Sequence, residues 1–472
     1  MVNIVVETRD HMMVERRDEG VGVPPGGRGL GFWMCTALVV GNMIGSGVFL
    51  LPASLAPFGW NALLGWLVTI AGALALAFVF ARLAQALPQA GGPYAYTEAA
   101  FGPGPGFVVA WTYWLSIVIG NAAIAIGSVS YMSVLIPVIG RVHALPPLLT
   151  VGIIWALTLL NCLGARSVGG VQLVVTLLKL LPLAAVMIVA VVVLASGSAS
   201  PLVLPPVADI HPAAITGAAA LALWALLGLE SATVPADKVI DAPRTIPRAT
   251  LFGTASAGLI YLCVCAAMLL LMPAEQLARS PAPFADFLER YVGGHAGPIV
   301  AAFAALSALG ALNGWVLLQG ELPSVMAQRG LFPRWLARTT ANGTPVRAHC
   351  VSGVVLTATV MMNFQRTMVD LFTFIALLST TVSLFAYLFS MLAALNLQAR
   401  GRMPASVPTR VLAIVGAVYS LWAIWGAGAR PALWGLAFLM SALPIYLLMR
   451  RSGRGASGWA FRREGCAPAP RA

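Results

Sequence analysis

The chain has 472 residues, of which 59% are hydrophobic and only 9% are charged. No water-soluble domain can hide that much apolar surface, so the composition excludes a soluble enzyme or binding domain and indicates an all-α polytopic membrane protein. The formal net charge of +12 does not indicate a nucleic-acid partner, because the distribution of the basic residues follows a membrane topology.

About twelve apolar stretches approach the roughly 20 residues that a helix needs to cross a bilayer. We expect twelve transmembrane helices at the following ranges: 30–57, 61–85, 105–138, 146–163, 172–196, 211–236, 247–272, 296–328, 347–364, 370–398, 408–428 and 431–450. The first apolar run continues directly into a full span, so no cleavable signal peptide is expected.

The basic residues are distributed unevenly between the two sides of the predicted membrane. If the N-terminus is cytoplasmic, the inner loops and tails hold 22 of the 28 Lys and Arg residues. The outer loops hold five of them, and Lys179 lies inside a span. This asymmetry is the positive-inside rule. It predicts a multi-pass protein of the cell (inner) membrane with both termini in the cytoplasm and the lipid bilayer as its partner.

Glycine interrupts the first predicted span. The stretch Gly41–Phe49 contains three glycines within seven positions, at 41, 45 and 47, and Ser46 stands between the last two. Glycine is unfavourable inside a helix, so we expect local unwinding here. Unwound backbone is tolerated in a membrane only where it faces protein, a cavity or a ligand. Broken helices at mid-membrane are how many transporters build their binding sites.

The sixth predicted span contains a second interruption. Gly228 and Glu230 lie in its middle, five spans after the first break. Equivalent breaks in two halves indicate an inverted repeat with a site at its interface. We predict repeats at about 30–196 and 211–398. The alternative for Glu230 is a buried carboxylate that pairs with a distant basic group.

Three further residues are unusual at mid-membrane, and each has two interpretations. Asn121 lines a cavity or makes a structural hydrogen bond between helices. Lys179 is a functional cation or a side chain that extends to the inner surface. Trp315 is an aromatic wall for a cationic ligand or a core packing residue. The hydroxyl groups near Ser379 can bond back to their own helix, so they say little alone.

Five stretches resemble one family of transporters over nearly the whole chain. They are Gly41–Phe49 with the following Leu51 and Pro52, Gly91–Tyr96, Leu223–Ala232, Gly310–Trp315 and Gly330–Pro333. With these motifs the chain resembles the amino acid–polyamine–organocation (APC) superfamily. It is most similar to the basic amino acid/polyamine antiporters, which include arginine/agmatine and putrescine/ornithine exchangers.

The resemblance implies a LeuT-type fold, in which ten helices form a five-plus-five inverted repeat with helices 1 and 6 broken. The expected parts are a cytoplasmic tail at 1–29, a transport core at 30–398, helices eleven and twelve at 399–450, and a cytoplasmic tail at 451–472. The family's antiporters are often dimers, so a homodimer is compatible with the resemblance.

The resemblance also implies roles for individual residues. Gly45, Ser46 and Gly47 would bind a substrate carboxylate, and carbonyl groups near Ile44 and Leu227 would bind an α-ammonium group. Trp224 and Trp315 would flank the ligand, and Glu230 would take part in amine recognition and pH response. The far end of the pocket would be lined by Ser116, Ile117, Asn121 and Ser379. The gate residues would be Tyr113 and Tyr387.

The predicted function is therefore secondary active exchange of a basic amino acid for its decarboxylated amine. The pairs expected are arginine/agmatine, lysine/cadaverine or ornithine/putrescine, so the partner is a small cationic amino acid or polyamine. Lys179 departs from the antiporter pattern and is similar to a lysine of proton-coupled amino acid transporters. A proton-coupled amino acid permease that uses Lys179 therefore remains the alternative.

An enzyme or a sensor is a different class of interpretation. The sequence has no His/Cys/Asp cluster, no paired carboxylates and no phosphate-binding loop at mid-membrane. We therefore expect no catalytic residues, no metal site and no cofactor. The residues after Arg450 are too few and too rich in Gly, Ala, Pro and Arg to form a receptor domain.

Overall fold

The structure of the chain is a computed structural model. It describes residues 30–87, 92–142, 144–163, 168–197, 207–233, 239–328, 330–340, 343–361 and 367–451. The predicted tails at 1–29 and, apart from Arg451, at 451–472 lie outside these residues.

The regular elements of the described chain are helices, apart from one isolated bridge between Leu30 and Val239. Nine helices of the described residues are long and apolar enough to cross a membrane. These are α3 (Trp60–Ala86), α5 (Pro103–Leu135), α7 (Leu145–Cys162), α8 (Val168–Ala195), α10 (Ala242–Leu271), α13 (Ala296–Gln328), α15 (Met368–Ala399), α16 (Val407–Gly426) and α17 (Ala429–Arg451).

Three apolar helices are shorter: α1 (Phe32–Met43), α9 (Pro212–Ala225) and α14 (Val346–Met361). The connecting segments form the short helices α2 (Leu51–Leu55), α4 (Pro93–Phe101), α6 (Val138–Arg141), α11 (Ala274–Arg279) and α12 (Pro283–Tyr291). The structure thus supports a polytopic helical membrane protein, and α1 and α9 are short because the expected breaks interrupt them.

The first break follows Met43. The Gly45 N–H bonds the carbonyl oxygen of Met43 rather than that of Gly41, and a 3₁₀ turn η1 (Ser46–Phe49) follows. The Gly41 carbonyl accepts a hydrogen bond from Lys179 Nζ of α8 at 3.2 Å, and the Met43 carbonyl accepts one from the Tyr261 hydroxyl of α10 at 2.8 Å. Neighbouring helices therefore satisfy the backbone groups that the break releases.

The second break follows Ala225. A turn of five residues leads from α9 to the 3₁₀ turn η4 (Ser231–Thr233), and Gly228 adopts a φ of 96° within that turn. This left-handed conformation favours glycine, because a Cβ atom would add strain. The break therefore depends on Gly228, and it turns the following Glu230 toward the interior of the molecule.

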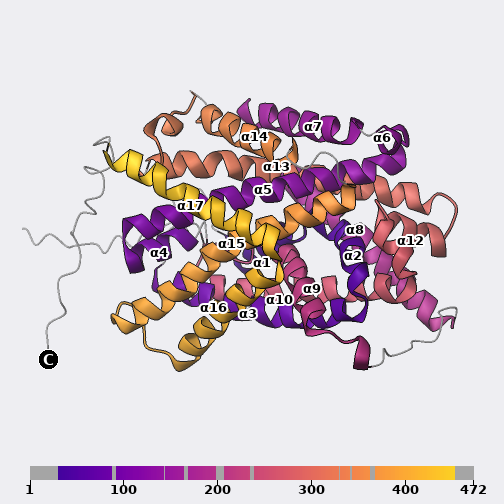
Figure 1. Cartoon of the computed structure of the whole chain (residues 1–472), viewed down its shortest axis with the longest axis horizontal. Helices are drawn as coiled ribbons and strands as arrows, with labels where there is room; N and C mark the ends of the chain where they lie inside the picture. Colours follow the sequence, from indigo (N-terminus) through magenta and orange to yellow (C-terminus); the bar gives the residue numbers. More distant parts are fainter. Residues whose placement is uncertain are drawn as a thin grey trace, which may run out of the picture.

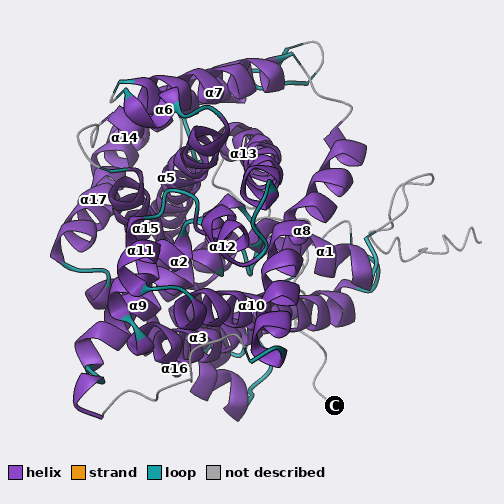
Figure 2. Cartoon of the chain, turned by 90° about the vertical axis from the view of Figure 1, so that its right-hand side faces the viewer, coloured by secondary structure: helices purple, strands orange, loops and turns teal. Residues whose placement is uncertain are grey.

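The two interrupted helices pack against long helices on one side of the molecule. Helices α7 and α14 lie on one side in both views, at the top of Figure 1 and Figure 2, and α3, α10 and α16 lie on the opposite side. Helix α1 packs against α10, and α9 packs against α3 and α16. Helix α5 is packed against both α13 and α15. The breaks are thus enclosed by full-length helices.

One short segment covers the end of the first break. The Tyr131 hydroxyl of α5 donates to the carbonyl oxygen of Phe49 at 2.8 Å and accepts a hydrogen bond from the backbone N–H of Phe284 at 3.2 Å. The rings of Phe49 and Phe284 also meet edge to face, with centroids 5.1 Å apart. Tyr131 therefore joins η1 to the α11–α12 segment.

Small residues allow the interrupted helices to approach their neighbours. A Cβ atom on Gly65 of α3 would lie 2.9 Å from the Cβ of Ala218 and 3.0 Å from the backbone nitrogen of Ala219, both in α9. A Cβ atom on Gly253 of α10 would lie 2.8 Å from a methyl group of Val39 in α1. Close contact through small residues is the usual basis of helix association in membranes.

We predict that Gly65→Val lowers the melting temperature of the purified protein by at least about 4 °C, because a larger side chain must push α9 away from α3. The matched control is Gly152→Val on α7, where an added Cβ would meet no atom within 4 Å. A thermal unfolding measurement in detergent compares the two variants. Equal melting temperatures for both would contradict the predicted close contact.

Candidate functional site

A pocket lies where the two broken helices meet α5, α13 and α15, and the space inside it, including the part open to solvent, is about 560 Å³. Eleven residues predicted from the sequence line this pocket. They are Gly45, Tyr113, Ser116, Ile117, Asn121, Trp224, Leu227, Glu230, Trp315, Ser379 and Tyr387. Residues that lie far apart in the sequence therefore meet in one cavity.

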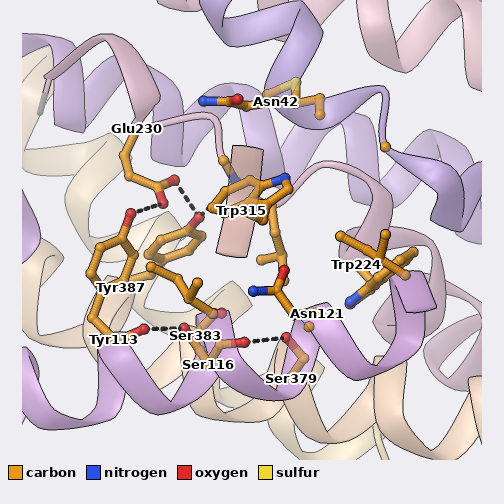
Figure 3. A pocket seen from close by; sticks show the side chains of 17 residues that line it. Asn42, Tyr113, Ser116, Asn121, Trp224, Glu230, Trp315, Ser379, Ser383 and Tyr387 are labelled. Carbon is orange, nitrogen blue, oxygen red and sulfur yellow. Dashed lines mark hydrogen bonds between the residues drawn. The ribbon is translucent and has the colours of Figure 1, made fainter. Parts of the chain in front are cut away.

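The pocket has two different ends. Figure 3 shows Glu230 with Tyr113 and Tyr387 on one side and Trp224 on the other, and Trp315 lies between them. Trp224 is held by an edge-to-face contact with Phe372 of α15, with ring centroids 5.2 Å apart. The cavity therefore has a carboxylate at one end and an aromatic wall along its length.

The carboxylate of Glu230 is held by two hydroxyl groups. The Tyr113 hydroxyl donates to Oε1 at 2.9 Å, and the Tyr387 hydroxyl donates to Oε2. The side chain is only 2% exposed, and it forms no ion pair with a described residue. Among the described residues, Glu230 therefore has tyrosine partners and no basic partner.

The floor of the pocket is fixed by contacts between α5 and α15. The Ser379 hydroxyl donates to the backbone carbonyl of Ser116 at 2.9 Å, and the Ser116 hydroxyl donates to the carbonyl of Tyr113 at 2.8 Å. A Cβ atom on Gly120 would lie 3.1 Å from the Ser379 oxygen, so only a small residue fits there. Ser379 thus bonds across to α5 rather than back to its own helix.

Two predicted residues, Ile44 and Lys179, are described and do not line the pocket. Ile44 follows the break, and the binding of an ammonium group near it stays a prediction. The surroundings of Ser46 and Gly47 lie outside the described part of the chain, so their binding of a carboxylate also stays a prediction. Lys179 is 1% exposed and contacts the Gly41 carbonyl instead of the cavity. It does not extend to the membrane surface, because its amino group is bonded within the protein.

The structure adds six lining residues that the sequence analysis did not assign to the binding site, although it placed Gly228 at the second break. They are Asn42, Met43, Gly120, Ile124, Gly228 and Ser383. Helical spacing was the signal available for three of them. Ile124 lies three residues after Asn121, Gly120 lies three after Ile117, and Ser383 lies midway between Ser379 and Tyr387. Asn42 and Met43 adjoin the break, where the face that a residue presents depends on the local backbone.

The chemistry of this site suits a ligand with a positive charge. Glu230 is the one acidic residue among the seventeen lining residues, and none of those seventeen is Lys, Arg or His. An anion enclosed in an apolar site is costly unless a cation or strong hydrogen-bond donors compensate it. A ligand cation could supply that compensation, and Trp315 offers a π face to it.

A helical membrane protein with a pocket between two broken helices has the architecture of a transporter. The family model described as "Amino acid permease" matches residues 30–449. The chain therefore belongs to the amino acid permease family of the APC superfamily, and it is a transporter rather than an enzyme.

Three curated relatives have a similar length. The chain is 33% identical over 412 residues to the cadaverine/lysine antiporter of Escherichia coli (strain K12). The aligned region covers 85% of this chain and 90% of the relative. It is 30% identical over 416 residues to the putrescine transporter PotE of the same strain, with coverages of 86% and 92%. It is 31% identical over 412 residues to PotE of Haemophilus influenzae (strain ATCC 51907 / DSM 11121 / KW20 / Rd), with coverages of 86% and 93%.

We predict that Glu230→Gln reduces transport of cationic substrates at least tenfold and flattens its dependence on pH. Glutamine can still bond the two tyrosines, but it carries no charge to attract a cation or to titrate. Uptake of labelled substrate into proteoliposomes between pH 5 and 8 measures both effects. The matched control is Glu289→Gln, which alters a carboxylate that bonds the Gly297 N–H outside the pocket. A pH profile that Glu230→Gln leaves unchanged would remove this residue from the coupling role.

Proposed function

We propose that the chain exchanges a basic amino acid for its decarboxylated amine, of the arginine/agmatine, lysine/cadaverine or ornithine/putrescine type. The observation that carries this proposal is the buried carboxylate of Glu230, which faces the pocket without a cationic partner among the lining residues. The names of the relatives, a cadaverine/lysine antiporter and putrescine transporters, support the same class of substrate.

The binding mode follows from the two ends of the pocket. One ammonium group of the substrate lies near Glu230, and the alkyl chain lies along Trp315, whose π face contributes about 0.5–2 kcal/mol toward a nearby cation. When the substrate is an amino acid, its carboxylate is bound by the N–H groups of Gly45–Gly47, which form the start of the half-helix after the break.

The transport cycle is alternating access between the two sides of the membrane. The hydroxyl groups of Tyr113 and Tyr387 hold Glu230 in the structure, and a substrate cation competes for that carboxylate. Exchange follows if the carrier reorients only when it is loaded, because an empty carrier would have to reorient with no ligand cation to compensate the charge of Glu230. We assign Tyr113 and Tyr387 the role of gate residues because both line the pocket and bond Glu230 at one end of it.

The proposed architecture is a LeuT-type fold with twelve spans and two inverted repeats, at about 30–196 and 211–398. The breaks in α1 and α9 support the relation between the repeats. The uneven distribution of basic residues supports an inner-membrane protein with both termini in the cytoplasm. The α11–α12 segment, which Tyr131 joins to η1, would then lie on the outer side.

The proposal is tested by loading proteoliposomes with a counter-substrate. We predict that vesicles preloaded with 5 mM putrescine, cadaverine or agmatine take up the matching labelled amino acid at least tenfold faster than empty vesicles. Vesicles without protein correct for leakage. Equal uptake into empty and preloaded vesicles would contradict exchange.

Proton-coupled uptake of an amino acid is the second candidate, because Lys179 is buried at the break in α1. Its amino group bonds the Gly41 carbonyl, so a change in its protonation would act directly on the unwound segment. A lysine near the carboxyl end of α1 is also favoured by the helix dipole. The same contact allows a purely structural role, in which Lys179 caps the broken helix.

The variant Lys179→Gln separates these two roles, because glutamine can donate a hydrogen bond to Gly41 but cannot carry a proton. For an exchanger, we predict that this variant keeps at least half of the exchange rate in preloaded vesicles. Uptake into empty vesicles driven by a pH gradient is measured in parallel. If wild-type protein shows such uptake and Lys179→Gln abolishes it, the proton-coupled function holds and exchange fails.

A further inference from the structure

A proline in α13 changes the hydrogen bonding of the turn that precedes it. Pro323 has no N–H, so the carbonyl oxygen of Gln319 lacks its usual donor four residues later. Two side chains from neighbouring helices replace that donor. Trp114 Nε1 of α5 donates to the Gln319 oxygen at 3.0 Å, and the Ser352 hydroxyl of α14 donates to it at 2.8 Å. The backbone of Gln319 is therefore fixed from two sides.

The next residue brings α14 into close contact with α13. A Cβ atom on Gly320 would lie 2.1 Å from Nδ1 of His349, whose side chain is fully buried. Residues with a Cβ atom do not fit at this position, because the imidazole ring lies against the backbone of α13. Together with the bonds from Trp114 and Ser352, this contact leaves the turn around Gln319 little freedom to rotate.

The side chain of Gln319 reaches the pocket through a second amide. Gln319 is 0% exposed, and its Oε1 accepts a hydrogen bond from Nδ2 of Asn121 at 2.7 Å. Asn121 lines the pocket, and Gln319 lies one helical turn after Trp315, which also lines it. The amino group of Asn121 donates to Gln319, which is not a lining residue. This bond fixes the orientation of the Asn121 amide in the pocket.

The oxygen of Asn121 is left without a partner. Asn121 Oδ1 is buried and accepts no hydrogen bond. Figure 3 shows this oxygen pointing toward Trp315, in the interior of the pocket. Buried polar atoms are normally paired, so an orphan acceptor that faces a cavity marks a place for a donor from a ligand.

We infer that Gln319 is a positioning residue that turns the amide oxygen of Asn121 toward the substrate, where it accepts a hydrogen bond from an N–H donor of the cation. The inference rests on the proposed function and adds to it. Glu230 binds one nitrogen of the substrate, and Asn121 accepts a hydrogen bond from a second N–H donor of the substrate on the other side of Trp315. Ligands with N–H donors at both ends, such as α,ω-diamines, then bind more tightly than ligands with a single amino group.

The reverse orientation of both amides gives the opposite specificity. Gln319 Nε2 would then donate to Asn121 Oδ1, and the amino group of Asn121 would face the substrate as a donor. Such a pocket would favour a carbonyl or carboxylate group at that end. Two substitutions distinguish these arrangements: Gln319→Glu keeps an acceptor toward Asn121, whereas Gln319→Met is similar in size but offers neither an acceptor nor a donor.

The test measures binding of putrescine and cadaverine to the full-length protein in nanodiscs by calorimetry, together with KM and kcat in proteoliposomes. We predict that Gln319→Met raises Kd and KM for both diamines about tenfold and changes kcat less than twofold. Gln319→Glu stays within about threefold of the wild type. The matched control is Asn161→Leu, which removes another amide–amide bond to α13, between Asn161 and Asn313 at 2.9 Å, outside the pocket. This variant is predicted to bind diamines as the wild type does.

The outcomes separate the inference from the proposed function. Wild-type protein that binds neither the diamines nor the dibasic amino acids would refute the proposed function itself. If the wild type binds diamines and Gln319→Met leaves Kd unchanged, the positioning role is wrong. An equal loss in Gln319→Met and Asn161→Leu would indicate general destabilisation and would also overturn it. If Gln319→Met does not fold, a tenfold loss in a folded Gln319→Glu decides against the inference, because that variant retains the acceptor.

Discussion

The structure depends on keeping one carboxylate inside the membrane with no cation from the described residues beside it. Glu230 is 2% exposed, and the described structure compensates it with hydroxyl groups of Tyr113 and Tyr387 instead of a salt bridge. Hydroxyl donors stabilise an anion less than a cation does, so the site retains an affinity for positive charge. The surrounding helices hold the tyrosines, the tryptophans and this carboxylate around one cavity.

The breaks in α1 and α9 create that cavity, and each break needs partners for its backbone groups. Lys179 and Tyr261 bond the carbonyl groups released at the end of α1. The same principle recurs in α13, where Pro323 releases the Gln319 carbonyl and Trp114 and Ser352 bond it. In both places, an interruption of one helix releases a backbone carbonyl group, and side chains of adjacent helices bond it in an apolar environment. Both interruptions lie next to residues that line the pocket.

The sequence was informative where a single residue conflicts with a membrane helix. The glycines before Phe49, the charge of Glu230 and the position of Trp315 each indicated the pocket without any structural information, and the apolar runs located the long helices to within a few residues. The direction in which individual side chains point was harder to predict from the sequence. Ile124 and Ser383 needed a known helix face, and Gln319 lies in a helix whose contacts with α5 and α14 are set by tertiary packing.

The central claim is that the pocket selects cations, and a competition panel tests it most directly. Labelled putrescine bound to the purified protein is challenged with arginine, agmatine, lysine, cadaverine, ornithine and several neutral amino acids at equal concentration. The account predicts that at least one basic amino acid and its decarboxylated amine displace the label, whereas leucine, alanine and serine do not. Displacement by neutral amino acids at the same concentrations as by the cations would contradict it.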